Sequence, residues 1–128
     1  MIRIAIVDDH AMVRAGLRQF FADEPDFSVV AEAANGREAL DLVRQGELDV
    51  MVMDISMPDH SGIDALVAIK ARAPDLPVLI LSGFSEVHYA TTMLRHGASG
   101  YLNKDCDPAD IITAIRTCLL YTSPSPRD

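Results

Sequence analysis

The pattern of hydrophobic and polar residues divides this chain into five strands, each followed by a helix. Between the strands, apolar residues recur at helical spacing, for example at Val13, Leu17 and Phe21. Most of the strand-like runs are continuously apolar, which is typical of parallel strands that are buried on both faces. The predicted strands are Ile2–Val7, Phe27–Ala33, Leu48–Met53, Val78–Leu81 and Ser99–Asn103. This regular alternation predicts an α/β fold, in which helices cover both faces of a parallel sheet.

Capping and turn residues predict where several helices begin and end. Asn35 is expected to cap one helix, and Asp107-Pro108 is expected to begin the last one. Gly97 is expected to stop the helix predicted at 86–96. Residues 58–62 are predicted to form a loop, after which the third helix follows.

The end of the chain has a different character from the rest. Residues 118–128 break the helical pattern and are rich in serine and proline. Traced back to codons, they resemble one reading frame of an adapter that is used to prepare sequencing libraries. We therefore expect residues 1–117 to form one domain, truncated near the end of its last helix, and residues 118–128 to be a non-native tail. A natural Ser/Pro linker is the alternative. The last helix is expected to reach about Leu120, because Pro124 cannot continue it.

Composition restricts the classes of function. A chain of 128 residues with 49% hydrophobic residues can bury a core as a single domain. Its net charge of −8 argues against direct binding to nucleic acid or to an anionic membrane. It contains no run of 18 apolar residues and begins with a strand rather than a signal peptide, so we expect a cytoplasmic protein. Cys106 and Cys118 lack metal-binding or redox spacing and are interpreted as free thiols.

Charged and hydroxylated residues stand where four of the predicted strands end. They are Asp8 and Asp9 after the first strand, Asp54 after the third, Ser82 after the fourth and Lys104 after the fifth. Because the carboxyl ends of parallel strands meet at one edge of a sheet, we expect an acidic pocket with one cation beside it. A single Asp is usually only a helix cap and a single Lys a surface charge, but the conjunction on four strands favours a functional site.

The residue types in this pocket predict phosphoryl chemistry. Carboxylates this close together need a cation between them, and Mg²⁺ prefers such oxygen ligands and pairs them with phosphate oxygens. Asp54 is the best nucleophile candidate, because a carboxylate can accept a phosphoryl group as an acyl phosphate. Lys104 could neutralise the oxygens of the transferring group, and the hydroxyl of Ser82 could bind one of them.

Residues 2–117 resemble the receiver domain of bacterial two-component response regulators. The motifs that carry the resemblance are Val7–His10, Met53–Pro58, Gly62, Leu81–Gly83 and Gly97–Asp105. The resemblance implies a flavodoxin-like (βα)5 sandwich with strand order 2-1-3-4-5. It also implies that Asp54 is the phosphoacceptor, that Lys104 pairs with the phosphate, and that Ser82 and Tyr101 form a switch pair. The implied Mg²⁺ ligands are Asp8, Asp9, Asp54 and the backbone carbonyl of Ser56.

The same resemblance implies the partners. A sensor histidine kinase would supply the phosphoryl group, phosphorylation could promote a homodimer, and the domain would catalyse only its own phosphorylation and dephosphorylation. His10, Val13–Leu17, Val30–Ala33 and Lys104-Asp105 are similar to the NarL/LuxR-type subfamily, whose members regulate transcription. DNA would then be bound only through a helix-turn-helix output domain that is absent from this chain, and no membrane is expected to take part.

Two alternative functions belong to other classes of protein. A phosphohydrolase can also form an aspartyl phosphate, but it typically needs a second acid two residues after the nucleophile, where this chain has Ser56. The second alternative is a stand-alone receiver that acts by protein–protein interaction. The histidines His10, His60, His88 and His96 lack ligand spacing, so we expect transition metals to gain nothing from them, although His10 could influence the pocket as the neighbour of Asp9.

Overall fold

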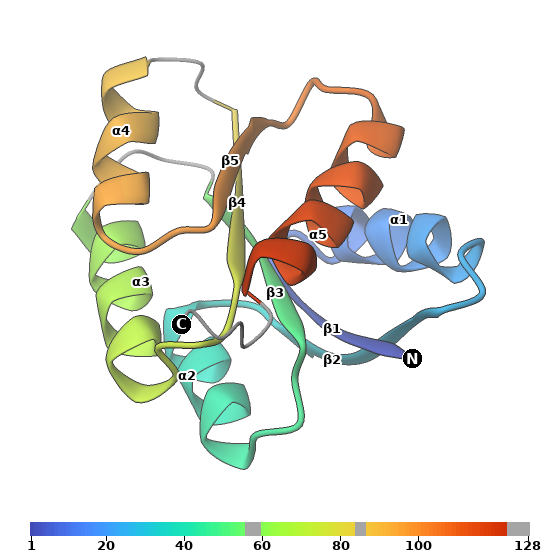
Figure 1. Ribbon diagram of the computed structural model, residues 1–128, viewed down its shortest axis with the longest axis horizontal. Coiled ribbons are helices and arrows are strands. Elements are labelled where there is room, and N and C mark those ends of the chain that lie inside the picture. Colours follow the sequence, from blue (N-terminus) through green and yellow to red (C-terminus); the bar gives the residue numbers. More distant parts are fainter. Residues whose placement is uncertain (56–59, 84–86, 123–128) are drawn as a thin grey trace.

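The computed structural model describes residues 1–55, 60–83 and 87–122. Within these residues, five strands and five helices alternate along the chain (Figure 1). They are β1 (Ile2–Val7), α1 (Ala11–Ala22), β2 (Phe27–Ala33), α2 (Gly36–Gln45), β3 (Val50–Ile55), α3 (His60–Arg72), β4 (Val78–Ser82), α4 (Val87–Arg95), β5 (Gly100–Asn103) and α5 (Pro108–Thr122). The strands form one parallel sheet in the order β2-β1-β3-β4-β5. The predicted fold class and strand order are confirmed.

The sheet lies between two layers of helices, with α1 and α5 on one face and α2, α3 and α4 on the other (Figure 1). Alternate residues of β1 point to opposite layers. Ile4 and Ile6 belong to the core beneath α1 and α5, whereas Ala5 and Val7 belong to the core beneath α2 and α3. All four are buried, so this strand is apolar throughout because both of its faces are covered.

Local capping contacts explain why several elements begin and end where they do. The side chain of Asn35 accepts a hydrogen bond from the backbone N–H of Glu38 at 2.9 Å, and Glu38 accepts one from Ala34 N–H at 2.8 Å. This pair resembles a capping box, except that Glu38 binds the N–H of Ala34 rather than that of the N-cap residue Asn35. Asp107 caps α5 by accepting from Ala109 N–H at 2.9 Å. Gly97 follows α4 with φ of 109°, a conformation that glycine adopts without strain. The three predicted caps are confirmed.

Other predicted boundaries were wrong by a few residues. β3 spans Val50–Ile55 rather than Leu48–Met53, because the backbone of Asp54 and Ile55 continues to pair with β4. α3 already begins at His60, inside the predicted loop 58–62, of which residues 58–59 lie outside the described residues. α5 ends at Thr122, two residues beyond the predicted Leu120.

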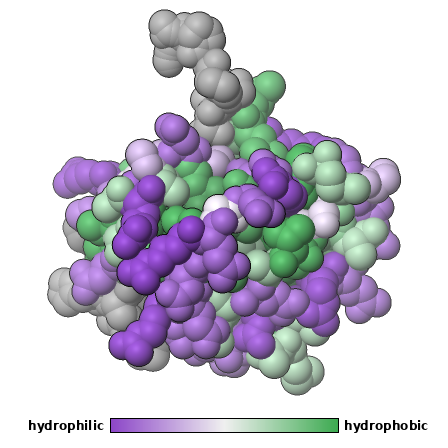
Figure 2. All heavy atoms as spheres, turned by 90° about the horizontal axis from the view of Figure 1, so that it is seen from below, coloured by the Kyte–Doolittle hydropathy of each residue, from purple (hydrophilic) through white to green (hydrophobic). Residues whose placement is uncertain are grey.

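Polar residues cover most of the face shown in Figure 2, and hydrophobic residues appear there in smaller patches. Across the described residues, large exposed hydrophobic side chains such as Met12, Val67 and Leu94 come from separate helices. In the described parts of the chain, no helix combines the length and the apolar character needed to cross a bilayer. Cys106 and Cys118 are not joined in a disulfide.

Candidate functional site

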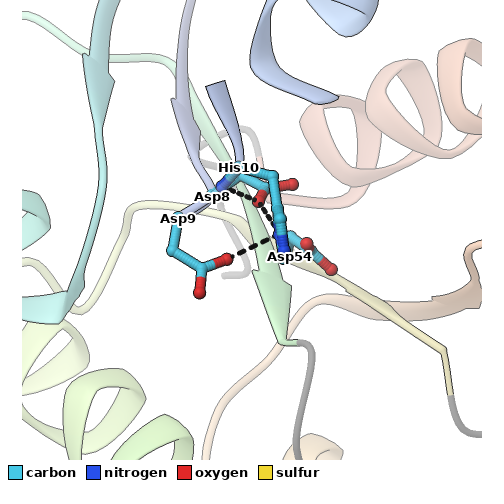
Figure 3. A group of neighbouring side chains, drawn as sticks. All are labelled: Asp8, Asp9, His10 and Asp54. Carbon is cyan, nitrogen blue, oxygen red and sulfur yellow. Dashed lines mark hydrogen bonds and ion pairs between the residues drawn. The ribbon is translucent and has the colours of Figure 1, made fainter. Parts of the chain in front are cut away.

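Four side chains meet at the carboxyl ends of the two central strands (Figure 3). Asp8, Asp9 and His10 follow β1, and Asp54 lies in the neighbouring strand β3. Because Val7 pairs with Met53, the residues that come next on the two strands are brought side by side. One oxygen or nitrogen atom from each of the four lies within 4.8 Å of the others. The predicted meeting of the strand ends therefore occurs for Asp8, Asp9 and Asp54.

Asp54 is buried and paired with a lysine from the other end of the sequence. Its side chain is 2% exposed, and its Oδ2 accepts a hydrogen bond from Lys104 Nζ at 2.7 Å. The backbone N–H of Lys104 donates to the carbonyl of Ser82 at 2.7 Å, which fixes the chain as it leaves β5. Burial, followed by the neighbouring Asp8 carboxyl, raises the pKa of Asp54 to about 6, although Lys104 acts in the opposite direction. The site therefore destabilises the ionised form of Asp54 relative to its protonated form.

Two carboxylate oxygens in this site lack a hydrogen-bond donor within the part of the chain that the structure describes. Among the described residues, the buried atoms Asp8 Oδ2 and Asp54 Oδ1 have no partner. Buried oxygens of ionised groups are costly unless a donor or a cation reaches them. Mg²⁺ binds such hard oxygen ligands, so the donor set fits this ion. The residues that would hold it are Asp8, Asp9 and Asp54, while Ser56, the fourth predicted ligand, lies outside the described residues.

The two predicted switch residues lie on the neighbouring strands β4 and β5. Ser82 is fully buried and pairs with Ile55, one position beyond Asp54 along β3. Tyr101 pairs with Ile80, two positions before Ser82, and packs against the core beneath α2, α3 and α4. This placement puts Ser82 at the same edge of the sheet as Asp54, whereas Tyr101 lies on the neighbouring strand β5, two positions before that edge.

The structure adds one residue that was not anticipated at the site. Arg14 of α1 donates a hydrogen bond from Nη1 to the backbone carbonyl of Asp8 at 2.5 Å, and its Nε donates to Glu32 of β2 at 3.2 Å. Arg18 also pairs with Glu32, and the hydrogen bond from Arg18, together with the one that Arg14 donates to Glu32, lowers the pKa of that carboxyl. The turn that carries Asp8 is therefore held from α1. Sequence spacing gives no signal for this contact, because Arg14 and Glu32 are 18 positions apart.

Comparison with known proteins agrees with this geometry. The response regulator receiver domain family matches residues 4–116. The chain belongs to this family. The receiver domain is 42% identical over 115 residues to the transcriptional regulatory protein DegU of Brevibacillus brevis, covering 90% of this chain and 49% of the relative. It is 36% identical over 117 residues to the response regulator UvrY of Escherichia coli K12, covering 91% and 54%.

A solved structure of a LuxR-family response regulator supports the similarity to the NarL/LuxR-type subfamily. The receiver domain superposes with a TM-score of 0.87 and 38% identity on a two-component response regulator of the LuxR family from Aurantimonas sp. SI85-9A1, covering 93% of this chain and 85% of that chain. The predicted family, a two-component receiver with LuxR-type relatives, is therefore confirmed. The chain spans about half the length of the curated relatives described above.

Proposed function

We propose that this receiver domain accepts a phosphoryl group on Asp54 from the phosphohistidine of a sensor histidine kinase. The observation that carries the proposal is the environment of Asp54, a carboxylate at the end of a central strand whose Oδ2 contacts Lys104 and whose Oδ1 has no donor among the described residues. An ordinary structural carboxylate would have its oxygens satisfied. The family supports the role, because receiver domains belong to two-component systems.

The proposed reaction is a transfer between two nucleophiles. A carboxylate oxygen of Asp54 attacks phosphorus and forms a P–O bond, while the P–N bond of the donor breaks and its electron pair stays on the departing imidazole. Lys104, now 2.7 Å from Asp54, would turn to an oxygen of the incoming group. Bound Mg²⁺ would neutralise negative charge on the phosphoryl oxygens. Asp8 and Asp9 would hold that ion together with Asp54 and the Ser56 carbonyl.

The product acts as a signal. A phosphoryl group adds charge and strong hydrogen-bond acceptors beside the buried hydroxyl of Ser82. We propose that Ser82 moves to meet it, that Tyr101 changes position in response, and that the surface around α4, β5 and α5 changes with them. Such a change is a shift between two populations of the same domain. Apart from this reaction and the hydrolysis of its own acyl phosphate, the domain would have no catalytic activity.

The parent protein would use this signal to control transcription in the cytoplasm. The curated relatives are about twice as long as the matched segment, and DegU carries the name of a transcriptional regulatory protein. We propose that the natural protein continues into a helix-turn-helix domain, which would bind DNA, and that phosphorylation promotes a homodimer. The charge of −8 on the present chain agrees with DNA binding by another domain.

Acetyl phosphate with MgCl₂ tests the proposal without the unidentified kinase. We expect one phosphoryl group on the peptide that contains Asp54, mapped by mass spectrometry, and none in Asp54→Asn. Asp49→Asn is the matched control, because Asp49 precedes the same strand but forms an ion pair with Arg3. It should be labelled like the unchanged protein. Labelling of another residue while Asp54 stays unmodified would show that the assignment is wrong.

A further inference from the structure

The imidazole of His10 lies among the carboxylates of the site. Its Nδ1 is 2.8 Å from Asp9 Oδ1 and 3.3 Å from Asp8 Oδ1. Figure 3 shows the ring extending from the start of α1 toward Asp54, with both contacts drawn. Sequence spacing alone predicts no metal-binding role for any histidine. The structure makes His10 an exception, because it brings the ring nitrogen into the group of three acidic side chains.

The distances match those between ligands of one metal ion. With bonds of about 2.0–2.1 Å, neighbouring ligands of an octahedral ion are separated by about 3 Å and opposite ligands by about 4.2 Å. The distances from His10 Nδ1 to Asp9 Oδ1 and Asp8 Oδ1 are 2.8 and 3.3 Å, close to the separation of neighbouring ligands. One ligand atom from each of the four residues lies within 4.8 Å of the others. The limit of 4.8 Å is wider than the distance between opposite ligands, so the side chains would have to draw together around a bound ion.

Two independent features indicate that the cluster is built for a cation. Asp8 and Asp54 have side chains that are 0% and 2% exposed, and each presents one oxygen without a donor among the described residues. The ring of His10 is not tied to its own helix, and its Nδ1 faces the carboxylates of Asp8 and Asp9. His10 stands at the N-cap of α1 but makes no side-chain capping hydrogen bond, and its side chain remains 58% exposed. Its ring is therefore available to a metal at the mouth of the pocket.

We propose that His10 is a metal ligand through Nδ1, and that the pocket accordingly binds borderline divalent ions such as Co²⁺, Ni²⁺ or Zn²⁺ in competition with Mg²⁺. The inference rests on the proposed function to the extent that both use the same pocket. Three carboxylates alone favour Mg²⁺ or Mn²⁺. An imidazole ligand raises the affinity for divalent ions that come later in the first transition row, such as Co²⁺, Ni²⁺ and Zn²⁺. Coordination by Nδ1 requires the ring proton to be on Nε2. The identity of the bound ion would then depend on which metals are available to the domain.

Co²⁺ is the probe, because it resembles Mg²⁺ in coordination geometry and reports its ligands by visible absorption. Calorimetric titration measures the affinities of Co²⁺ and Mg²⁺ for the unchanged protein, His10→Gln and His96→Gln. His96 is exposed and lies directly after α4, which makes it the matched control for loss of a surface histidine. We expect His10→Gln to lower Co²⁺ affinity by about tenfold or more, a loss comparable to that caused by removing a metal-site partner. The ratio of Co²⁺ to Mg²⁺ affinity should fall as well, and His96→Gln should change neither quantity.

Spectroscopy provides the second measurement. Bound Co²⁺ has a visible absorption spectrum, and in proton NMR it strongly shifts the signal of a coordinated imidazole. Both signals should be altered or lost in His10→Gln and kept in His96→Gln. Excess Mg²⁺ should displace Co²⁺ from the unchanged protein. Unchanged Co²⁺ affinity and spectrum in His10→Gln, or tighter binding of both ions, would overturn the proposal. The proposed function is tested separately by labelling the unchanged protein at Asp54 with MgCl₂, so either idea can fail while the other holds.

Discussion

Replacing Asp54 with Asn should stabilise the metal-free domain. The folded state raises the pKa of Asp54 from 3.8 to about 6, because the carboxyl is buried next to Asp8. This rise in pKa corresponds to about 3 kcal/mol. This is the free energy by which ionised Asp54 destabilises the fold relative to a neutral side chain. Asn has nearly the same shape and carries no charge, and Lys104, which is 27% exposed, can be solvated when its partner is lost.

The effect should depend on pH in a defined direction. Below about pH 4, Asp54 is protonated in both the folded and unfolded states and contributes no difference. Between about pH 4 and 6 the folded state keeps a proton that the unfolded state has lost, so stability falls as pH rises through this range. Above about pH 6 the full cost is present. The advantage of Asp54→Asn should therefore be small at pH 4 and reach up to about 3 kcal/mol at pH 7.5.

Urea unfolding followed by circular dichroism, with EDTA present, measures this advantage at each pH. At pH 7.5 the midpoint should rise by roughly 1 M or more, given m-values of about 1–3 kcal/mol per M. Asp49→Asn is the control, because it should change the free energy of unfolding in the opposite direction. Burial alone would raise the pKa of Asp49, but its hydrogen bonds with Arg3 and the charge of Arg3 outweigh burial and lower this pKa. Removing the Asp49 carboxylate should therefore destabilise the domain at pH 7.5. If Asp54→Asn is no more stable than the unchanged protein, or if its advantage is the same at pH 4 and pH 7.5, ionised Asp54 does not destabilise the fold.

Three further predictions concern packing and the support of the site. Gly36→Ala should lower the free energy of unfolding by about 1–3 kcal/mol in urea titrations, because its new Cβ would lie 2.8 Å from a side chain of α3; unchanged stability would contradict the close packing of α2 on α3. Arg14→Gln should weaken Mg²⁺ binding by about tenfold in calorimetry, since it removes the contact with the turn after β1, whereas Arg18→Gln should have little effect. Deleting residues 123–128 should leave the melting temperature nearly unchanged, whereas deleting 118–128 should destabilise the domain by about 1–3 kcal/mol by removing a buried part of α5; equal melting temperatures would argue against the second expectation.

The sequence by itself determined the order of the elements and most of their caps. Strand and helix periodicities are local properties, and Asn35, Gly97 and Asp107 act on backbone groups only a few residues away. The strand ends also predicted the group of Asp8, Asp9 and Asp54, because parallel strands bring their carboxyl ends to one edge whatever the details of packing. These features depend on short-range patterns or on topology alone.

The end of β3 needed the tertiary structure. Asp54 was predicted to follow the strand because a carboxylate is an unfavourable residue inside a buried one. In the fold, Asp54 remains within β3, where Lys104 contacts it across a separation of 50 residues. A partner so distant in sequence does not change the local pattern, so strand length could not be read from periodicity.

Only the tertiary structure decided the electrostatics of the site and the roles of His10 and Arg14. The raised pKa of Asp54 comes from burial and from Asp8, which follows the neighbouring strand β1. His10 belongs to the group because its ring turns toward Asp8 and Asp9, and Arg14 reaches the Asp8 carbonyl from α1 while it pairs with Glu32 of β2. Side-chain direction and burial are set by elements that meet only after folding, and pKa values and metal ligands depend on distances of a few ångströms between such elements.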